Sequence, residues 1–242
     1  MAAPLAIDLF CGLGGWTEGL LLEGYDVVGF DIEHHVYGEH RYPAQLVLQD
    51  VATIVGRQFK DAALIVASPP CQAYSYRAMP WKKAKALPPP SNELFDHCFR
   101  IQREAIEAAG RFIPLVVENV RGAQPWVGRS RWNYGSFHLW GDVPALMPMD
   151  KAIKNSGGSW FSIGSPGQKV TGQNPAHAIA KEAREDGLKI GGDWFSDPNS
   201  TCRRHGSKSK ARKQASAMIA KIPLPLSRHI AAYWKPRAEA AA

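Results

Sequence analysis

The sequence has few cysteines and no long apolar run, and each absence removes a class of protein. Its four cysteines are Cys11, Cys71, Cys98 and Cys202, and they form no CxxC pair and no metal-ligand spacing. We therefore expect neither a disulfide framework nor a bound metal. No stretch approaches the roughly eighteen consecutive apolar residues that a membrane-spanning helix needs, so we expect no membrane partner.

The beginning of the chain, "MAAPLAIDLF", lacks the basic and long apolar segments of a secretory signal peptide. We therefore expect a cytoplasmic protein whose thiols are reduced. The chain has 242 residues, of which 45% are hydrophobic. That length predicts one domain with a substantial core and a small appendage.

Acidic residues are outnumbered by basic ones, and the formal net charge is +7. An excess of this sign indicates an acidic partner such as nucleic acid. Much of the positive charge lies in two runs, "RAMPWKKAK" at 77–85 and "RRHGSKSKARK" at 203–213. Each run has an equally ordinary interpretation as a solvated segment with no partner.

Apolar segments alternate with helical patterns over the first part of the chain. We predict strands at 4–10, 26–30, 44–50, 62–68 and 112–120, and helices at 16–25, 93–110 and 224–234. Strands that alternate with helices predict an α/β fold with a doubly wound, mostly parallel sheet. Ligands of such sheets bind at the carboxyl ends of the strands.

The composition divides the chain into three parts. Residues 1–149 carry the α/β pattern and form the expected catalytic and cofactor-binding domain. Residues 150–216 are rich in Gly, Ser, Asn, Lys and Arg with isolated aromatics, which predicts a small irregular region. Residues 217–242 are expected to return to the first domain through a helix.

Each predicted strand has a polar side chain near its end: Asp8, Asp31, Asp50, Cys71 and Glu118. Asp31 could hold both hydroxyls of a ribose, with Ile32 flat against a purine and Asp50 accepting from its exocyclic amine. The glycines of "DLFCGLGG" (8–15) would let the backbone approach such a ligand closely. Together these residues predict a nucleoside-shaped site, although acids at strand ends also commonly serve as turn or cap residues.

Two prolines stand directly before Cys71. Pro69 and Pro70 remove two backbone donors and restrict φ, so they hold the backbone that carries the thiol in a rigid conformation at a strand end. A nucleophile needs such rigidity because its rate depends steeply on approach geometry. Glu118, at the end of the neighbouring predicted strand, could act as an acid toward a ring nitrogen, or it could be a structural carboxylate.

The motifs "DLFCGLGG", "PPCQ" and "ENV", in this order, resemble those of the cytosine-5 DNA methyltransferase family. The resemblance implies a Rossmann-like methyltransferase fold, S-adenosylmethionine as the cofactor and double-stranded DNA as the partner. It implies that Cys71 attacks carbon 6 of a flipped cytosine while Glu118 protonates ring nitrogen 3, so that carbon 5 accepts the methyl group. It also makes 150–216 the target-recognition region.

The resemblance assigns roles to further positions. The cofactor would be lined by Phe10, Cys11, Gly12, Leu13, Gly15, Asp31, Ile32, Asp50, Val51 and Pro70. Arg129 and Arg131 of "GRSRW" match an arginine-rich catalytic motif, although the glutamine that leads this motif in the family is missing. DNA contacts are expected from Arg77, Lys82, Lys83 and Lys85, and from Arg203, Arg204, Lys208, Lys210, Arg212 and Lys213.

Lys221 marks a departure from the family pattern. Ala220 and Lys221 stand where the family has Gly-Asn before its last helix, which would put a cation beside the transferred group. A carboxylate on that group would pair with the cation. One alternative is therefore carboxymethyl transfer from carboxy-S-adenosylmethionine, giving 5-carboxymethylcytosine; in another, Lys221 contacts a phosphate and the cofactor is ordinary.

Other interpretations stay open within the same resemblance. The chain could methylate RNA, or it could be a DNA-binding relative without activity. We favour a compact, monomeric DNA methyltransferase, and its small size suggests a stand-alone modification enzyme such as a phage-borne one.

Overall fold

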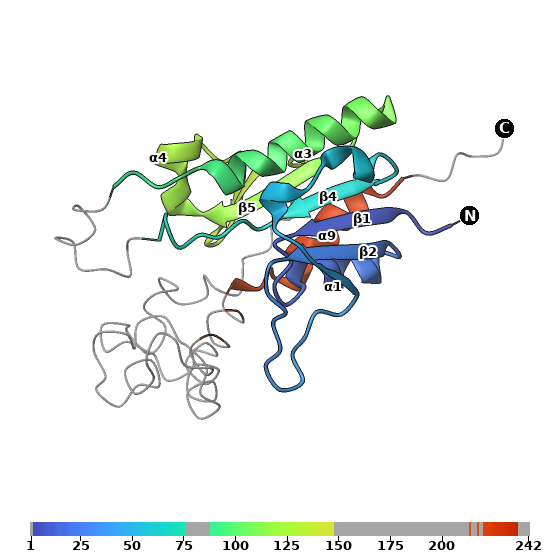
Figure 1. Ribbon diagram of the computed structural model, residues 1–242, viewed down its shortest axis with the longest axis horizontal. Coiled ribbons are helices and arrows are strands. Elements are labelled where there is room, and N and C mark those ends of the chain that lie inside the picture. The colour runs from blue at the N-terminus through green and yellow to red at the C-terminus, as the bar shows by residue number, and fades with distance from the viewer. Residues whose placement is uncertain (1, 76–87, 148–212, 214–216, 218–219, 237–242) are drawn as a thin grey trace. The chain divides into compact units, whose positions relative to one another are not determined.

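The computed structural model describes residues 2–75, 88–147, 213, 217 and 220–236 (Figure 1). Its backbone divides into two compact units, one of residues 1–35, 42–148 and 222–242 and the other of residues 36–41 and 149–221. The first unit contains the sheet and is described below. Within the described ranges, no helix has the length and apolar character to cross a membrane.

The sheet has seven strands in the order β3-β2-β1-β4-β5-β7-β6. Strands β3, β2, β1, β4 and β5 run parallel, and β7 is antiparallel to both β5 and β6. This order confirms the predicted mostly parallel sheet. The strands are β1 Leu5–Leu9, β2 Asp26–Asp31, β3 Gln45–Leu48, β4 Leu64–Ala67, β5 Leu115–Val120, β6 Trp132–Tyr134 and β7 Phe137–Gly141.

Helices cover both faces of this sheet, as a doubly wound fold requires (Figure 1). Helix α3 lies on one side, and α1 and α9 lie on the other. The α-helices are α1 Gly15–Leu22, α3 Glu93–Ala109, α4 Gln124–Val127 and α9 Leu224–Trp234. Short 3₁₀ turns are η1 Val51–Thr53, η2 Gly56–Phe59 and η4 Arg121–Ala123.

The larger hydrophobic core lies between the sheet and α3. Helix α3 buries Phe95, Cys98, Ile101 and Ala105, which recur at the three- and four-residue spacing of one helix face. They pack on alternate residues of the central strands, such as Ile7, Ile65 and Leu115. The helix ends at Gly110, whose φ of 64° is the left-handed conformation that commonly ends a helix, as predicted from its position.

Helices α1 and α9 pack closely on the opposite face. A Cβ atom on Gly19 of α1 would lie 2.3 Å from the Ser227 hydroxyl of α9, so only glycine permits this approach. The Tyr25 hydroxyl after α1 also donates to the Ala231 carbonyl at 3.0 Å. The last helix is therefore part of the sheet unit although it is the last element described in the chain.

The β6–β7 hairpin was not predicted from the sequence. Residues Phe137 to Trp140 of β7 are all buried, polar His138 among them, so the strand lacks the alternation that marks a half-exposed one. Strand β6 has three residues. The hairpin extends the sheet beyond β5. The segment with Arg129 and Arg131 leads into β6, and the Arg131 N–H bonds the Leu139 carbonyl of β7.

Candidate active site at the carboxyl edge of the sheet

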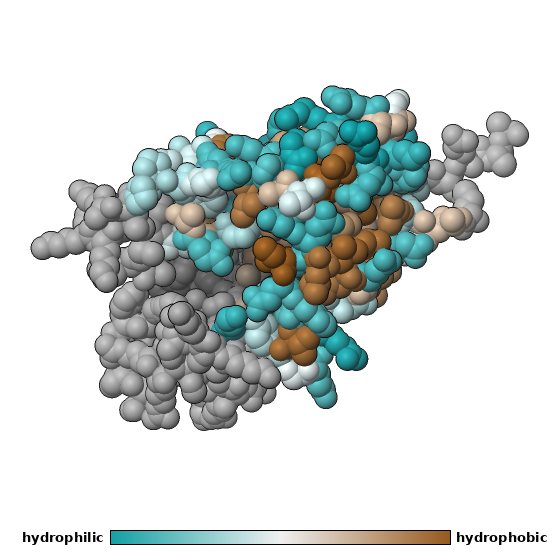
Figure 2. Space-filling model, in the orientation of Figure 1, coloured by the Kyte–Doolittle hydropathy of each residue, from teal (hydrophilic) through white to brown (hydrophobic). Residues whose placement is uncertain are grey.

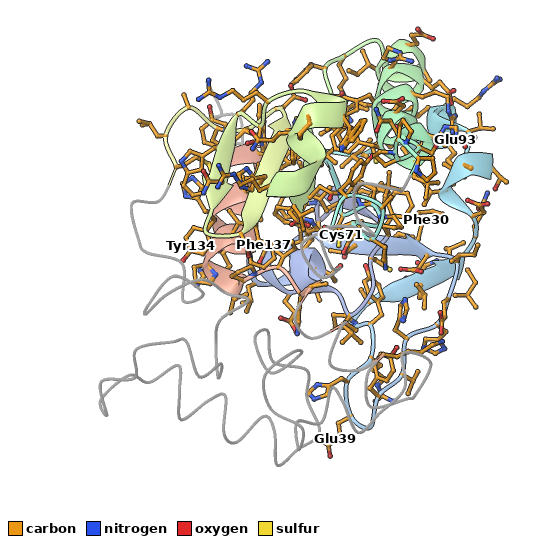
Figure 3. All side chains as sticks on the ribbon, turned by 90° about the vertical axis from the view of Figure 1, so that its left-hand side faces the viewer. Phe30, Glu39, Cys71, Glu93, Tyr134 and Phe137 are labelled. Atoms are coloured by element: carbon orange, nitrogen blue, oxygen red, sulfur yellow. The ribbon has the colours of Figure 1, made fainter. Side chains whose placement is uncertain are left out.

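The predicted functional residues of the first unit gather where the parallel strands end. Because β1, β2, β3, β4 and β5 are parallel, the segments that follow them meet at one edge. Figure 3 faces this edge and shows Cys71 near its middle, between Phe30 of β2 and Phe137 of β7. The strand order reverses between β1 and β4, the position at which such sheets bind ligands.

The glycine-rich turn after β1 has an unusual backbone. Phe10 has φ of 57°, the sole positive value outside glycine among the described residues, and Gly12 and Gly14 have φ of 51° and 77°. A non-glycine residue in this region carries strain that the surrounding structure must offset. The Gly14 N–H bonds the Cys11 carbonyl at 2.8 Å, so the turn is closed tightly before α1 begins.

Asp31 ends β2 and anchors this turn. Its carboxylate oxygens accept the N–H of Gly12 at 2.9 Å and the N–H of Glu33 at 3.1 Å. Burial opposes ionisation of Asp31, but hydrogen bonds from His35 and from these backbone groups hold its pKa below the ordinary value. An ionised carboxylate has further lone pairs, so Asp31 fits the predicted role of accepting ribose hydroxyls.

An apolar surface lies beside Asp31. Ile32 is 75% exposed and Leu48, which pairs with Asp31 across the strands, is 60% exposed. Figure 2 shows apolar side chains of this kind standing out among hydrophilic ones on the face that it draws. Val51, by contrast, is only 2% exposed. Ile32 therefore suits the flat face of a purine better than Val51, which lies in the hydrophobic core.

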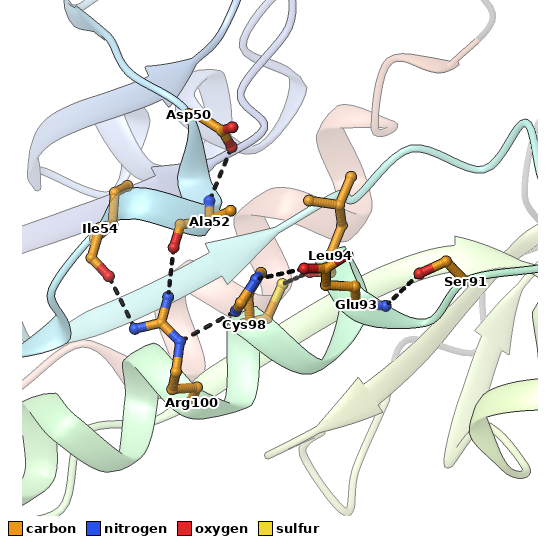
Figure 4. Close-up of polar contacts among 9 residues, drawn as sticks. Asp50, Ala52, Ile54, Ser91, Glu93, Leu94, Cys98 and Arg100 are labelled. Atoms are coloured by element: carbon orange, nitrogen blue, oxygen red, sulfur yellow. Dashed lines mark hydrogen bonds and ion pairs between the residues drawn. The ribbon is translucent and has the colours of Figure 1, made fainter.

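Asp50 lies after β3 and caps the short η1 turn. Its Oδ1 accepts the Ala52 N–H at 2.9 Å. The same turn is fixed to α3, because Arg100 donates to the carbonyls of Ile54 at 2.9 Å and Ala52 at 3.2 Å (Figure 4). Asp50 is exposed and held in place, which fits its predicted role as an acceptor for an exocyclic amine.

The segment that carries Cys71 is anchored to its neighbours. The Ser68 N–H bonds the Leu9 carbonyl at 3.1 Å, and the Ser68 hydroxyl accepts from the Trp16 indole at 3.0 Å. The Asn119 amide donates to the Pro69 carbonyl at 2.9 Å. These contacts and the two prolines hold Cys71 half-buried at the edge.

The other described cysteines differ from Cys71. Cys11 and Cys98 are buried, and burial raises the pKa of both thiols. A thiol with a raised pKa has little thiolate and is a poor nucleophile. Cys71 is therefore the described cysteine that suits a nucleophilic role, and Cys11 can line a ligand only through its backbone.

Glu118 lies inside β5, two residues before the strand ends at Val120. It was expected at the end itself. Its side chain is 8% exposed, and it points to the opposite face from Asn119 because side chains alternate along a strand. Strand β5 neighbours β4, which leads to Cys71, so both proposed catalytic groups come from adjacent strands.

Asp8 was expected among the polar groups at the edge, and that expectation was wrong. It lies within β1, is 1% exposed, and accepts the Thr17 hydroxyl of α1 at 2.6 Å. Its other oxygen, Oδ1, has no hydrogen-bond partner among the described residues. Burial raises the pKa of Asp8 to about 7, so this carboxyl belongs to the packing of α1.

Asp8→Asn is expected to flatten the pH dependence of stability. The carboxyl titrates near 3.8 when exposed and near 7 when folded, so its contribution is fully present below pH 3.8 and is lost as the pH rises through 7. One proton changes the free energy of unfolding by about 1.4 kcal/mol per pH unit, or roughly 4 kcal/mol over this window. Urea unfolding of the wild-type and Asp8→Asn proteins at pH 5 and 7.5 tests this. An equal change in the free energy of unfolding between the two pH values in both proteins would contradict it.

The structure places Arg129 and Arg131 in an exposed loop between α4 and β6. Lys221, in the second unit, is half-buried and directly precedes buried Ile222. Lys213 is exposed. The other predicted DNA contacts lie outside the described residues: Arg77, Lys82, Lys83, Lys85, Arg203, Arg204, Lys208, Lys210 and Arg212.

Comparison with known protein families matches residues 5–124 to the C-5 cytosine-specific DNA methylase family. The chain belongs to this family. The matched region of this family member contains the glycine-rich turn, Asp31, Asp50, Cys71 and Glu118. The prediction from "DLFCGLGG", "PPCQ" and "ENV" is thereby confirmed at the level of the family.

Individual relatives are similar over parts of their length. The type II methyltransferase M.XorII of Xanthomonas oryzae pv. oryzae is 27% identical over 143 residues, which are 54% of this chain and 31% of that protein. A proposed DNA modification methyltransferase from an E. coli prophage is 25% identical, with a TM-score of 0.36 over 50% of this chain and 33% of its own. Entamoeba histolytica methyltransferase EhMeth is 16% identical and has a TM-score of 0.39. That match covers 66% of this chain and 61% of EhMeth. The chain thus spans about a third of the length of M.XorII.

Proposed function

We propose that the protein is a DNA cytosine-5 methyltransferase that uses S-adenosylmethionine. The observation that carries the proposal is the anchored Pro69-Pro70-Cys71 segment. It holds a half-buried thiol at the ligand-binding edge, next to the strand of Glu118. Membership of the C-5 cytosine-specific DNA methylase family supports the same chemistry.

In the proposed reaction the Cys71 thiolate adds to carbon 6 of a cytosine that has left the base stack. Glu118 donates a proton to ring nitrogen 3, so the electron pair released by the addition collects at carbon 5. When bound, the cofactor would supply an electrophilic methyl group, which carbon 5 would accept. Loss of the carbon 5 proton to a base then expels the Cys71 thiolate. Ring nitrogen 3 returns its proton to the Glu118 carboxylate, which restores both the ring and the enzyme.

The cofactor would lie along the edge formed by the ends of β1, β2 and β3. The backbone of the 10–15 turn, ionised Asp31 and exposed Asp50 offer it hydrogen-bond partners, and Ile32 offers an apolar surface. The Leu13 side chain of this turn is buried, so Leu13 would face the cofactor only through its backbone. Pro70, beside Cys71, would be the residue nearest to the transferred group.

Double-stranded DNA is the proposed partner. The net charge of +7 favours a polyanion, and exposed Arg129 and Arg131 would contribute contacts to it. The two basic runs, at 77–85 and 203–213, would add phosphate contacts. There are two alternatives, which the experiment below distinguishes. The protein could methylate RNA, or it could bind DNA without catalysis.

The identity of the transferred group is a second question. Lys221 directly precedes Ile222 and Pro223, where the last helix begins, and the family has asparagine at the matching position. A lysine favours an anion on the transferred carbon, as in carboxy-S-adenosylmethionine. The alternative product would then be 5-carboxymethylcytosine.

One competition experiment tests both questions. The purified protein is given duplex DNA or RNA with equal concentrations of the two cofactors, and the nucleosides are weighed by mass spectrometry. We expect 5-methylcytosine in DNA; carboxymethyl transfer that reverts to methyl transfer in Lys221→Asn would establish the alternative. Modified RNA alone, or DNA binding without any product, would contradict the proposed function.

A further inference from the structure

The loop that carries Arg129 and Arg131 is held at several points by hydrogen bonds to α4 and β7. We infer that Gln124, Ser130 and His138 are positioning residues, which hold residues 128–131 (the arginine loop) in one conformation for nucleic-acid binding. The inference rests on the proposed function and deepens it, because it assigns a role to residues outside the arginines themselves.

The loop is hydrogen-bonded to α4, which precedes it, and to β7, the strand that pairs with β6. At its start, the Gly128 N–H bonds the Gln124 carbonyl at 3.1 Å, and the Trp140 indole donates to the Gly128 carbonyl at 2.9 Å. At its end, the Arg131 N–H bonds the Leu139 carbonyl at 2.8 Å. Two of these ties reach β7, which is buried and paired with β5.

Ser130 lies at the centre of the arrangement. The Gln124 Oε1 atom is 3.2 Å from the Ser130 backbone nitrogen and 3.2 Å from its hydroxyl oxygen. The hydroxyl is also 2.9 Å from the Nδ1 atom of His138. One side chain between two exposed arginines thus connects helix α4 to strand β7.

The protons of this network can be assigned consistently. Gln124 Oε1 accepts the Ser130 N–H, and it can also accept the hydroxyl proton while His138 Nδ1–H donates to the hydroxyl oxygen. His138 is 8% exposed. Burial, together with the nearby Arg121, lowers the pKa of its imidazole and favours the neutral ring. The neutral tautomer with a proton on Nδ1 satisfies both contacts of the Ser130 hydroxyl.

The arginine motif of this chain lacks the glutamine that leads it in the family. Gln124 stands earlier, in α4, and its side chain reaches the arginine loop through space. With the loop backbone held, less conformational entropy is lost when the arginines bind phosphate or base. Removing the network should therefore weaken nucleic-acid binding without removing any charge.

Ser130→Ala deletes both hydroxyl contacts and tests the inference. We expect binding to duplex DNA to weaken about tenfold, the effect of removing one hydrogen bond of ordinary strength. The slope of log affinity against log salt should not change, because the protein still neutralises the same number of phosphates. Arg129→Ala with Arg131→Ala should instead lower the slope by about 0.9 for each phosphate that is no longer neutralised.

Two controls separate positioning from general stability. Ser130→Thr retains the hydroxyl and should restore binding. Asn133→Ala removes a polar contact to the Gly135 carbonyl in the same hairpin, and it should leave affinity unchanged.

A double-mutant cycle completes the test. In the Arg129→Ala, Arg131→Ala background, Ser130→Ala should have no further effect on affinity, because it acts through the arginines. Full affinity in Ser130→Ala would overturn the positioning role. So would an additive loss of affinity when Ser130→Ala is combined with Arg129→Ala and Arg131→Ala. Neither result would contradict the proposed function. A wild-type protein that shows no salt-dependent DNA binding would overturn the proposed function and this inference together.

Discussion

Cys71→Ser is expected to abolish base modification while cofactor binding persists. The hydroxyl of serine is far less acidic than a thiol, so it cannot supply the anion that must add to carbon 6. The Pro69 carbonyl and the Ser68 contacts that hold this segment do not involve the sulfur, so the substitution should leave the edge intact. The effect should be a complete loss of product.

Product formation on duplex DNA, followed by mass spectrometry, measures this loss. DNA that contains 5-fluorocytosine provides a second readout, because only a protein with an active nucleophile should form a covalent adduct with it. Cys98→Ser is the matched control: Cys98 lies inside α3, where its sulfur contacts the Leu94 carbonyl at 3.4 Å, and serine can keep that contact. Substantial turnover by Cys71→Ser would remove the central claim of the mechanism.

Glu118→Gln should bind DNA and cofactor but transfer the methyl group about a hundredfold to ten-thousandfold more slowly, the usual range for general acid help. An amide has the shape of the carboxyl but cannot donate an acidic proton to ring nitrogen 3. Glu118 is 8% exposed within β5. Because the amide has nearly the same size and shape as the carboxyl, it should fit there with little change in packing.

Single-turnover rates with saturating DNA isolate the chemical step from binding. Glu107→Gln, on the exposed side of α3, makes the same chemical change away from the edge and should leave the rate unaltered. A Glu118→Gln protein that turns over at the wild-type rate would show that the carboxyl has only a structural role.

Much of the sheet was predictable because its information is local. The apolar runs of β1, β4 and β5 and the spacing of Phe95, Cys98 and Ile101 in α3 reflect burial that each segment needs separately. Because the carboxyl ends of parallel strands share an edge, the sequence predicts that Asp31, Asp50 and Cys71 lie at the same edge.

Asp8 shows where local information fails. The sequence places it near a strand end like Asp31, but the pleat directs it toward Thr17 of α1 rather than toward the ligand edge. Which of the two acids faces the edge depends on the strand register and on the helix that packs over the strand. The residues next to each acid in the sequence do not determine either of these.

The sequence by itself determined the family, the parallel α/β sheet and the candidate nucleophile, because periodicity and the motifs around Cys71 are contained in short segments. Only the tertiary structure decided that Asp8 is a buried carboxyl with a raised pKa, that Asn119 holds Pro69, and that Gln124 and His138 meet Ser130. These contacts join side chains on different elements. Their geometry exists only after the strands and helices have packed, since hydrogen bonds require donor and acceptor to be brought within about 3 Å of each other.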